Sequence, residues 1–126
     1  MKTIHNIGFE YIEVLDGNLT KYAENIDELK AMMKNANVQM MSVCIGANFI
    51  YKDALEDEME HVEEVCKAAK EVGVTYLVIC GGAIRKGGIR PGDTKLLAEG
   101  IDEAKKIAKK YGLIACFHPH LGSIAE

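Results

Sequence analysis

The sequence lacks several features that mark particular classes of protein. It has only two prolines and no low-complexity tract, which argues against a disordered or linker protein. No apolar run approaches the roughly 18 residues of a membrane-spanning helix. The first residues, Met-Lys-Thr-Ile-His, lack the apolar core of a secretory signal. We therefore expect a cytoplasmic protein that makes no contact with membranes.

The chain also lacks a positive charge excess and closely spaced cysteines. It has 15 basic and 19 acidic residues, a net charge of −4, which disfavours a nucleic-acid partner. Its cysteines form no C-x-x-C pair, and three of them lie inside apolar runs. We expect free, buried thiols in a reducing compartment at Cys44, Cys66, Cys80 and Cys116.

Four apolar runs are the clearest pattern that is present. They begin near residues 9, 38, 74 and 113, and each follows a glycine or asparagine that can end a helix in the left-handed conformation: Gly8, Asn37, Gly73 and Gly112. Near-continuous apolar runs are typical of strands buried on both faces of a parallel sheet. Gly8 further predicts a helix before the first of these strands.

Helical periodicity separates the runs. Apolar residues recur at three- and four-residue spacing within 29–36, 55–72 and 97–111, which predicts three amphipathic helices that pack on the sheet. Asn25 with Glu28, and Asp53 with Glu56, have the spacing of helix N-terminal caps. The pattern predicts an α/β fold with parallel βα repeats and four strands.

Two architectures fit four parallel strands in 126 residues. A closed (β/α)8 barrel needs about 250 residues, so this chain would form about half of one. The alternative is a small open doubly wound sheet. No helix is predicted after the last strand, which favours a single partial barrel domain over residues 1–126.

The last strand ends in the strongest candidate for chemistry. His118 and His120 alternate along an extended segment, so both imidazoles should point to the same side, and Pro119 stiffens the backbone between them. In parallel α/β folds, function collects at the carboxyl ends of strands. The pair could hold a metal ion, or act as a general base and a substrate ligand.

The loop after the third strand is a candidate substrate-binding segment. It runs from Cys80 to Asp93, with Gly81 and Gly82 followed by three cations that include Arg85 and Arg90. Glycines let a backbone approach a ligand, and cations hold phosphate or carboxylate groups. The segment matches neither G-x-G-x-x-G nor a Walker motif.

Two polar residues near the ends of the first two strands complete the candidate set. Glu13 is a carboxylate in an otherwise apolar strand, where a buried acid needs a partner. It could face a substrate or form an ion pair with a neighbouring strand. Asn48 follows the second strand and is a weaker candidate for substrate binding.

Several stretches resemble the xylose-isomerase-like TIM barrels, the sugar phosphate isomerase/epimerase superfamily. The resemblance lies in Gly8–Val14, in Cys66–Gly73 with the strand that ends at Cys80-Gly81-Gly82, and in Tyr111–Ser123. The last stretch, with its His-Pro-His-x-Gly block, is similar to the inosose dehydratase branch. The resemblance covers nearly the whole chain and places its strands at positions two to five of a full barrel.

The resemblance implies a divalent metal, Mn²⁺ or Co²⁺, that polarises adjacent oxygens of a keto-sugar or keto-inositol. His118 is the one candidate metal ligand in this chain, but it stands where many relatives have a metal-binding glutamate, and the resemblance implies that the histidines of this branch hold substrate or move protons instead. The family's later ligands have no counterpart in this chain. The implied catalytic residues are therefore His118, His120 and Glu13, with substrate contacts from the loop residues.

Three functions follow from the residues and the resemblance. The first is an inosose-dehydratase-type lyase that removes a proton next to a carbonyl, present here as a fragment. The second is a ketose or ketose phosphate isomerase or epimerase. The third is a non-catalytic half-barrel that binds a small polyol or keto-sugar or associates with itself, since half a barrel leaves two sheet edges unpaired.

Overall fold

The computed structural model describes all residues from 1 to 126 and contains one sheet of four parallel strands in the order β1-β2-β3-β4. The strands are β1 (Tyr11–Leu15), β2 (Gln39–Ala47), β3 (Tyr76–Gly81) and β4 (Ile114–His118). They begin within one or two residues of the predicted positions 9, 38, 74 and 113.

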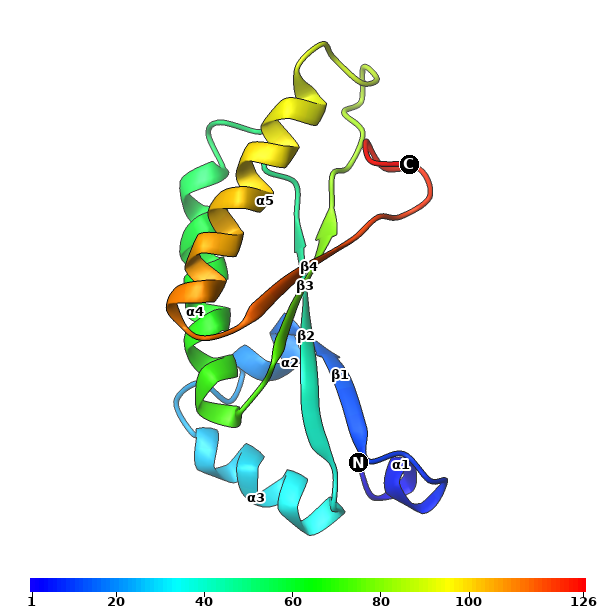
Figure 1. Cartoon of the computed structure of the whole chain (residues 1–126), viewed down its shortest axis with the longest axis vertical. Coiled ribbons are helices and arrows are strands. Elements are labelled where there is room, and N and C mark those ends of the chain that lie inside the picture. Colours follow the sequence, from blue (N-terminus) through cyan, green and yellow to red (C-terminus); the bar gives the residue numbers. More distant parts are fainter.

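Three long helices connect the strands, as the periodicity predicted. They are α3 (Ile26–Ala36), α4 (Leu55–Val72) and α5 (Asp93–Lys110). The structure also has two short helices. One is α1 (Lys2–Asn6), which lies before β1 as Gly8 indicated. The other is α2 (Asp16–Thr20), which the periodicity did not predict because it has only five residues. Helices α2 to α5 lie on one side of the sheet, with α4 packed between α3 and α5 (Figure 1).

The predicted helix boundaries are confirmed at most positions. Asn37 ends α3 with a φ of 52° and Gly73 ends α4 with a φ of 86°, both left-handed. Asn25 is the N-cap of α3 as predicted, but its side chain donates to the Glu28 carboxylate at 2.9 Å and makes no capping hydrogen bond to the helix backbone. The cap at Asp53 is wrong: α4 begins at Leu55 after Ala54, and no side chain caps it.

The consecutive strand order and the single helical layer decide between the two predicted architectures. A doubly wound sheet has a switch in strand order and helices on both faces. This sheet winds in one direction only and keeps the long helices on one face, as in the wall of a (β/α)8 barrel. The partial barrel is therefore confirmed.

The hydrophobic core lies between the sheet and the helices. Val43, Ile45, Leu77 and Ile79 point from the two central strands into this layer and are fully buried. Leu29, Val62 and Leu97 meet them from α3, α4 and α5. Each strand contributes alternate residues to this layer, so the others project from the opposite side of the sheet.

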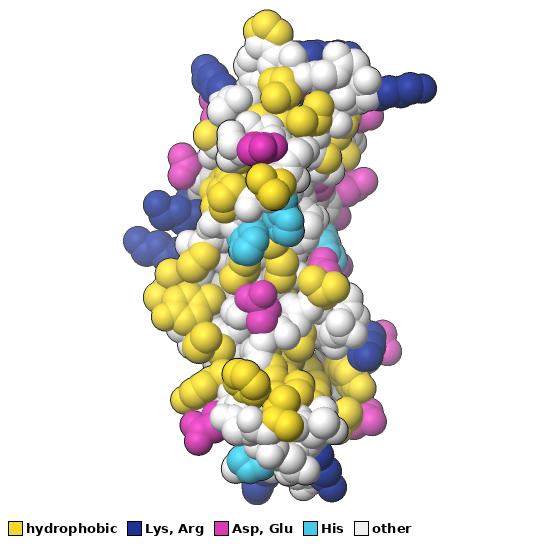
Figure 2. Space-filling view, turned by 90° about the vertical axis from the view of Figure 1, so that its right-hand side faces the viewer, with side chains coloured by type: hydrophobic (Ala, Val, Ile, Leu, Met, Phe, Trp, Pro, Cys, Tyr) yellow, Lys and Arg dark blue, Asp and Glu magenta, His cyan; other side chains and the backbone are white.

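That opposite side, which we call the open face, is not covered by helices. It carries Tyr11, Glu13, Leu15, Cys44, Tyr76, Val78, Cys80, Ile114, Cys116 and His118. Tyr11 is 52% exposed, Leu15 62% and Ile114 55%, so the prediction that the strands are buried on both faces is wrong for β1 and β4. Those two strands are the edges of the sheet and gain cover from one side only. Figure 2 shows apolar side chains spread over this face.

The cysteines follow the same division. All four are free, as predicted, but only Cys66 on α4 is buried. Cys44 and Cys80 are half-buried and Cys116 is exposed, because they point to the open face. The prediction of burial was therefore wrong for these three.

No helix in the structure has the length and apolar character needed to cross a membrane.

Candidate functional site

The histidine pair forms at the carboxyl end of β4. His118 is the last residue of the strand, and the His118 and His120 rings lie 4.7 Å apart between centroids at an angle of 42°. Both side chains are exposed, and Figure 2 shows two adjacent histidines near the middle of the open face. The prediction that both imidazoles point to the same side is confirmed.

Sheet register places Cys80 beside this pair. Cys80 is the partner of His118 across β3 and β4, and Gly46 is the partner of Cys80 across β2 and β3. The next row on the same face runs from Leu15 through Cys44 and Val78 to Cys116. Thiols and imidazoles therefore gather at the carboxyl end of the open face.

Glu13 lies away from the histidines. Its carboxylate accepts a hydrogen bond from the Ser42 hydroxyl at 2.6 Å, and the residue is exposed, not buried as a carboxylate in an apolar strand suggested. The row through Glu13, Ser42 and Tyr76 ends at Ile114, four residues before His118. Two strands also separate β1 from β4, so the structure does not bring Glu13 next to the pair.

Gly81 and Gly82 allow close approach between strand ends. A Cβ atom at Gly81 would lie 1.5 Å from the Ala47 carbonyl oxygen, so no larger residue fits there. The Gly82 amide donates to the same oxygen at 3.2 Å, and its carbonyl accepts from Ile124 at 2.7 Å. Close packing of the strand ends therefore explains why glycine occupies these two positions. Contact of either glycine with a substrate stays a prediction.

Asn48 joins the ends of β2 and β3. Its side-chain oxygen accepts a hydrogen bond from the Ala83 amide at 2.9 Å. The Glu58 carboxylate on α4 accepts from the amides of Asn48 and Phe49 at 2.7 and 2.9 Å, and this fixes the loop after β2. Glu58 was not singled out in the sequence, because the contact spans ten residues and leaves no local signal.

Arg85 fastens the glycine-rich loop from the inside. Its Nε donates to both Asp93 oxygens at 3.1 and 3.2 Å, its Nη2 donates to the Ile50 carbonyl, and its guanidinium stacks on the Tyr51 ring at 4.6 Å. Asp93 is buried and also accepts from the Arg90 amide at 2.9 Å. The hydrogen bond from Arg85 holds the pKa of Asp93 below its usual value.

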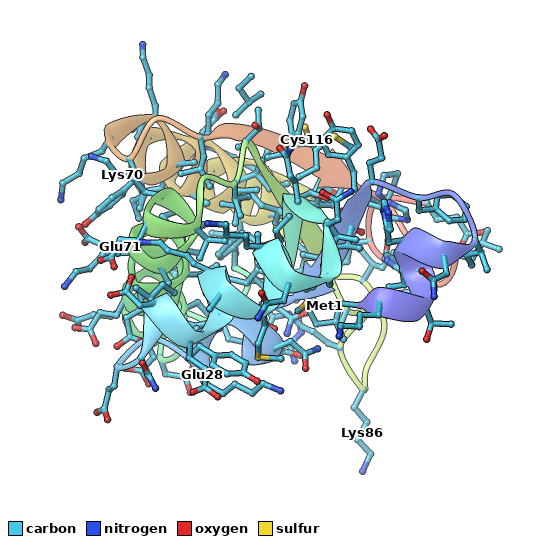
Figure 3. The ribbon with its side chains drawn as sticks, turned by 90° about the horizontal axis from the view of Figure 1, so that it is seen from below. Met1, Glu28, Lys70, Glu71, Lys86 and Cys116 are labelled. Carbon is cyan, nitrogen blue, oxygen red and sulfur yellow. The ribbon has the colours of Figure 1, made fainter.

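The remaining cations of this loop face solvent. Arg90 is exposed, and Lys86 extends from the tip of the loop away from the rest of the chain (Figure 3). An anion that binds to Arg85 would therefore compete with Asp93 for the N–H donors of the guanidinium. The Arg90 side chain forms no hydrogen bond or ion pair in the structure; only its backbone amide donates to Asp93. Substrate binding by Arg85 or Arg90 stays a prediction.

The structure also shows an acid–imidazole pair that the sequence did not indicate. His61 on α4 lies 2.7 Å from the carboxylate of Asp16, the first residue of α2, and lines a cavity of about 200 Å³. Ile45, Gly46 and Glu58 line that cavity with His61. His61 is half-buried.

The residues present do not fit a complete metal centre. No group of three or more His, Cys, Asp or Glu side chains is arranged to hold a metal ion. His118 and His120 are close together, but Glu13 is on the far strand and Asp16 is paired with His61. His118 as a metal ligand is therefore unsupported by a ligand set within this chain.

Comparisons with known proteins agree with this fold. The family model described as a xylose isomerase-like TIM barrel matches residues 1–126. No curated protein matches the chain significantly. Among solved structures, the chain is similar to the IOLI protein with a bound zinc atom, with a TM-score of 0.75 and 16% identity over 92% of this chain and 44% of that one.

Two further structures share the fold. One is 3-keto-D-glucoside 4-epimerase, YcjR, from E. coli, with a TM-score of 0.73 and 19% identity over 92% of this chain and 48% of that one. The other is a xylose isomerase-like TIM barrel protein from Mycobacterium smegmatis in complex with magnesium, with a TM-score of 0.77 and 13% identity over 98% and 46%. The chain thus spans less than half the length of these structures. It belongs to the xylose isomerase-like TIM barrel family.

Proposed function

We propose that this chain supplies the histidine-bearing part of a carbohydrate-processing active site that moves a proton next to a carbonyl group. The observation that carries the proposal is the His118–His120 pair, with rings 4.7 Å apart at the carboxyl end of β4. Histidine is the side chain that gains and loses a proton near neutral pH. Two of them at one strand end can serve one substrate as base and acid.

We infer that the reaction is dehydration of a keto-inositol, as in inosose dehydratases. One imidazole would take the proton from the carbon beside the carbonyl, and the other would protonate the departing hydroxyl. Pro119 fixes the backbone between them. The glycine-rich loop and Asn48 border the same edge of the sheet and would contact the hydroxyls of the ring.

Isomerisation or epimerisation of a keto-sugar is the second candidate. It is supported by the similarity to 3-keto-D-glucoside 4-epimerase. It uses the same proton removal but returns the proton to carbon instead of expelling water. The similar IOLI structure holds zinc and the Mycobacterium smegmatis structure holds magnesium, which suggests a test with Mn²⁺ or Co²⁺. This chain alone provides no set of three metal ligands, so the proton transfer proposed here uses its own histidines.

The assay separates these candidates directly. The purified chain is incubated with a keto-inositol or a keto-sugar in D₂O, with and without Mn²⁺ or Co²⁺, and products are followed by mass and NMR. Loss of water supports the lyase, and deuterium uptake without loss of water supports the isomerase or epimerase. His118→Ala and His120→Ala should each lower the rate at least about 100-fold, while His61→Ala should not.

Bound substrate without any turnover or deuterium uptake would contradict a catalytic role for this chain alone. It would leave the non-catalytic half-barrel that binds a polyol or keto-sugar. Equal rates in wild type and both histidine variants would remove the histidines from the proposal.

We further propose that the open face is covered by a second copy of the chain. β1 and β4 are both unpaired edges, and all strands are parallel. A twofold axis along the strand direction would pair β4 of each copy with β1 of the other and give eight parallel strands, the number in a closed barrel. That pairing would place β1 of one copy, which carries Glu13, beside β4 of the other, which carries His118.

A further inference from the structure

Two cysteines on the open face touch each other. The Cys44 and Cys80 sulfur atoms lie 2.8 Å apart on the neighbouring strands β2 and β3, and both residues are half-buried. They are 36 residues apart in the chain, and sheet pairing brings them together. The proposed proton transfer uses neither thiol.

The contact is close enough for a covalent bond to form with little movement. A disulfide has a sulfur–sulfur distance of about 2.05 Å, so the two atoms need to approach by less than about 1 Å. Gly46, the register partner of Cys80, has no side chain to cover it, and Cys44 is the residue of β2 whose side chain reaches Cys80. A small reagent therefore has access to the pair from the carboxyl end of the open face.

We propose that Cys44 and Cys80 are a modification site that forms a reversible disulfide on reaction with hydrogen peroxide. The site lies beside the histidine pair, because Cys80 is the register partner of His118. The disulfide would fix β2 to β3 at the edge where the candidate site lies. The formation of this bond does not depend on the proposed catalytic function.

The reaction begins at Cys80. Burial, the Cys80 thiol and the nearby Glu13 and Asp16 carboxylates raise the pKa of Cys44 to about 12, so Cys44 is a poor nucleophile. The Cys80 thiolate attacks one peroxide oxygen, the O–O bond breaks, and the leaving hydroxide takes a proton to become water. Cys80 is oxidised to a sulfenic acid and the peroxide is reduced.

Cys44 then completes the bond. Its sulfur attacks the Cys80 sulfur, the S–O bond breaks, and the released hydroxide takes the Cys44 proton and leaves as water. The sum is two thiols and one hydrogen peroxide giving one disulfide and two waters. A dithiol reductant reverses the change by thiol–disulfide exchange.

The test is a peptide map of the full chain. Trypsin places the four cysteines in four different peptides, because cleavage sites separate them: 35–52, 53–67, 71–85 and 111–126. The reduced chain is treated with hydrogen peroxide, unfolded, alkylated and digested. We expect peptides 35–52 and 71–85 to be joined, with a mass about 2 Da below their sum, and Cys66 and Cys116 to be alkylated.

Cys116 provides the matched control. It lies on the same face, on the edge strand β4, and it is exposed whereas Cys80 is half-buried. Cys116→Ser should leave the cross-link intact, whereas Cys80→Ser should abolish it. In Cys44→Ser, Cys80 should be trapped as a sulfenic acid by dimedone.

Alkylation of all four thiols after peroxide treatment would overturn the proposal. A cross-link from Cys80 to Cys116, or between two chains, would overturn it as well. If a variant fails to fold, the wild-type peptide map alone still decides between these outcomes.

Discussion

The two faces of the sheet come from alternate residues of the same strands, yet they have different roles. Leu77 and Ile79 point to the helices and are fully buried, while Val78 and Cys80, which alternate with them along β3, point to the open face and are half-buried. The covered face is packed with aliphatic side chains. The open face carries the thiols, the histidines and Glu13.

This difference supports the proposal that one face stabilises the chain and the other carries the candidate site. Stability comes mainly from apolar area removed from water, and the covered face provides most of it. Reactive side chains need access to small molecules, and the open face provides that access.

Gly81 and Gly46 lie at the same end of the sheet, but the space around them differs. In Gly81→Ala, the new Cβ would lie 1.5 Å from the Ala47 carbonyl oxygen, whereas nothing lies within 4 Å of a Cβ at Gly46. We expect Gly81→Ala to lower the free energy of unfolding by about 3 kcal/mol or more. Gly46→Ala should leave it nearly unchanged, as measured by urea denaturation. Equal effects would contradict the close approach at Gly81.

A pair of identical substitutions compares the faces directly. Leu77 is 0% exposed on the covered face, and Leu15 is 62% exposed on the open face. Leu77→Ala should lower the free energy of unfolding by about 2–5 kcal/mol, because it leaves a cavity in the core. At concentrations where the chain is monomeric, Leu15→Ala should stay within about 0.5 kcal/mol of the wild type. A larger loss for Leu15→Ala would show that the open face is part of the core.

The Arg85–Asp93 ion pair should make the free energy of unfolding depend on pH in the acid range. The hydrogen bond from Arg85 lowers the folded-state pKa of Asp93 below its ordinary value of 3.8. Its stabilising contribution is therefore fully present above that ordinary value and is lost as the pH falls through the folded-state pKa.

Asp93→Asn should consequently be less stable than the wild type near neutral pH, and the difference should shrink below about pH 4. Urea denaturation across pH 2.5–7 measures it, and the exposed Asp102→Asn on the same helix is the control. A difference between wild type and Asp93→Asn that grows on acidification would contradict the assignment.

Self-association should depend on the open face. Ile114 on β4 and Ile89 in the glycine-rich loop are both 55% exposed, which makes them a matched pair. Ile114→Ser should raise the dissociation constant of a dimer several-fold in analytical ultracentrifugation, because it weakens the β4 edge, and Ile89→Ser should not. A wild-type chain that stays monomeric at high micromolar concentration would contradict pairing through the open edges.

The fold was largely predictable because its signals are local. The periodic apolar residues and the left-handed stops at Asn37 and Gly73 define βα units without knowledge of distant contacts. The sequence could not show which strand faces would stay uncovered, because continuous apolar runs look the same whether one face or both are buried. The errors at Cys116 and Glu13 both follow from this.

The candidate site was predictable only in part. His118 and His120 are two residues apart, so their common direction follows from strand geometry. The pairs Asp16–His61, Arg85–Asp93 and Cys44–Cys80 join separate elements, and two of them span 36 or more residues. Such contacts depend on tertiary packing and leave no pattern in the sequence.

A histidine titration tests the central claim, that the open face at the end of β4 is the functional face. The chain has four histidines, so imidazole ¹H–¹⁵N spectra of the wild type, assigned with single His→Gln variants, report on each one as a keto-inositol or a keto-sugar is added. We predict that the His118 and His120 signals shift together in a saturable way, while those of His5 and His61 do not move. Unchanged His118 and His120 signals, or shifts confined to His61 beside its own cavity, would contradict the claim.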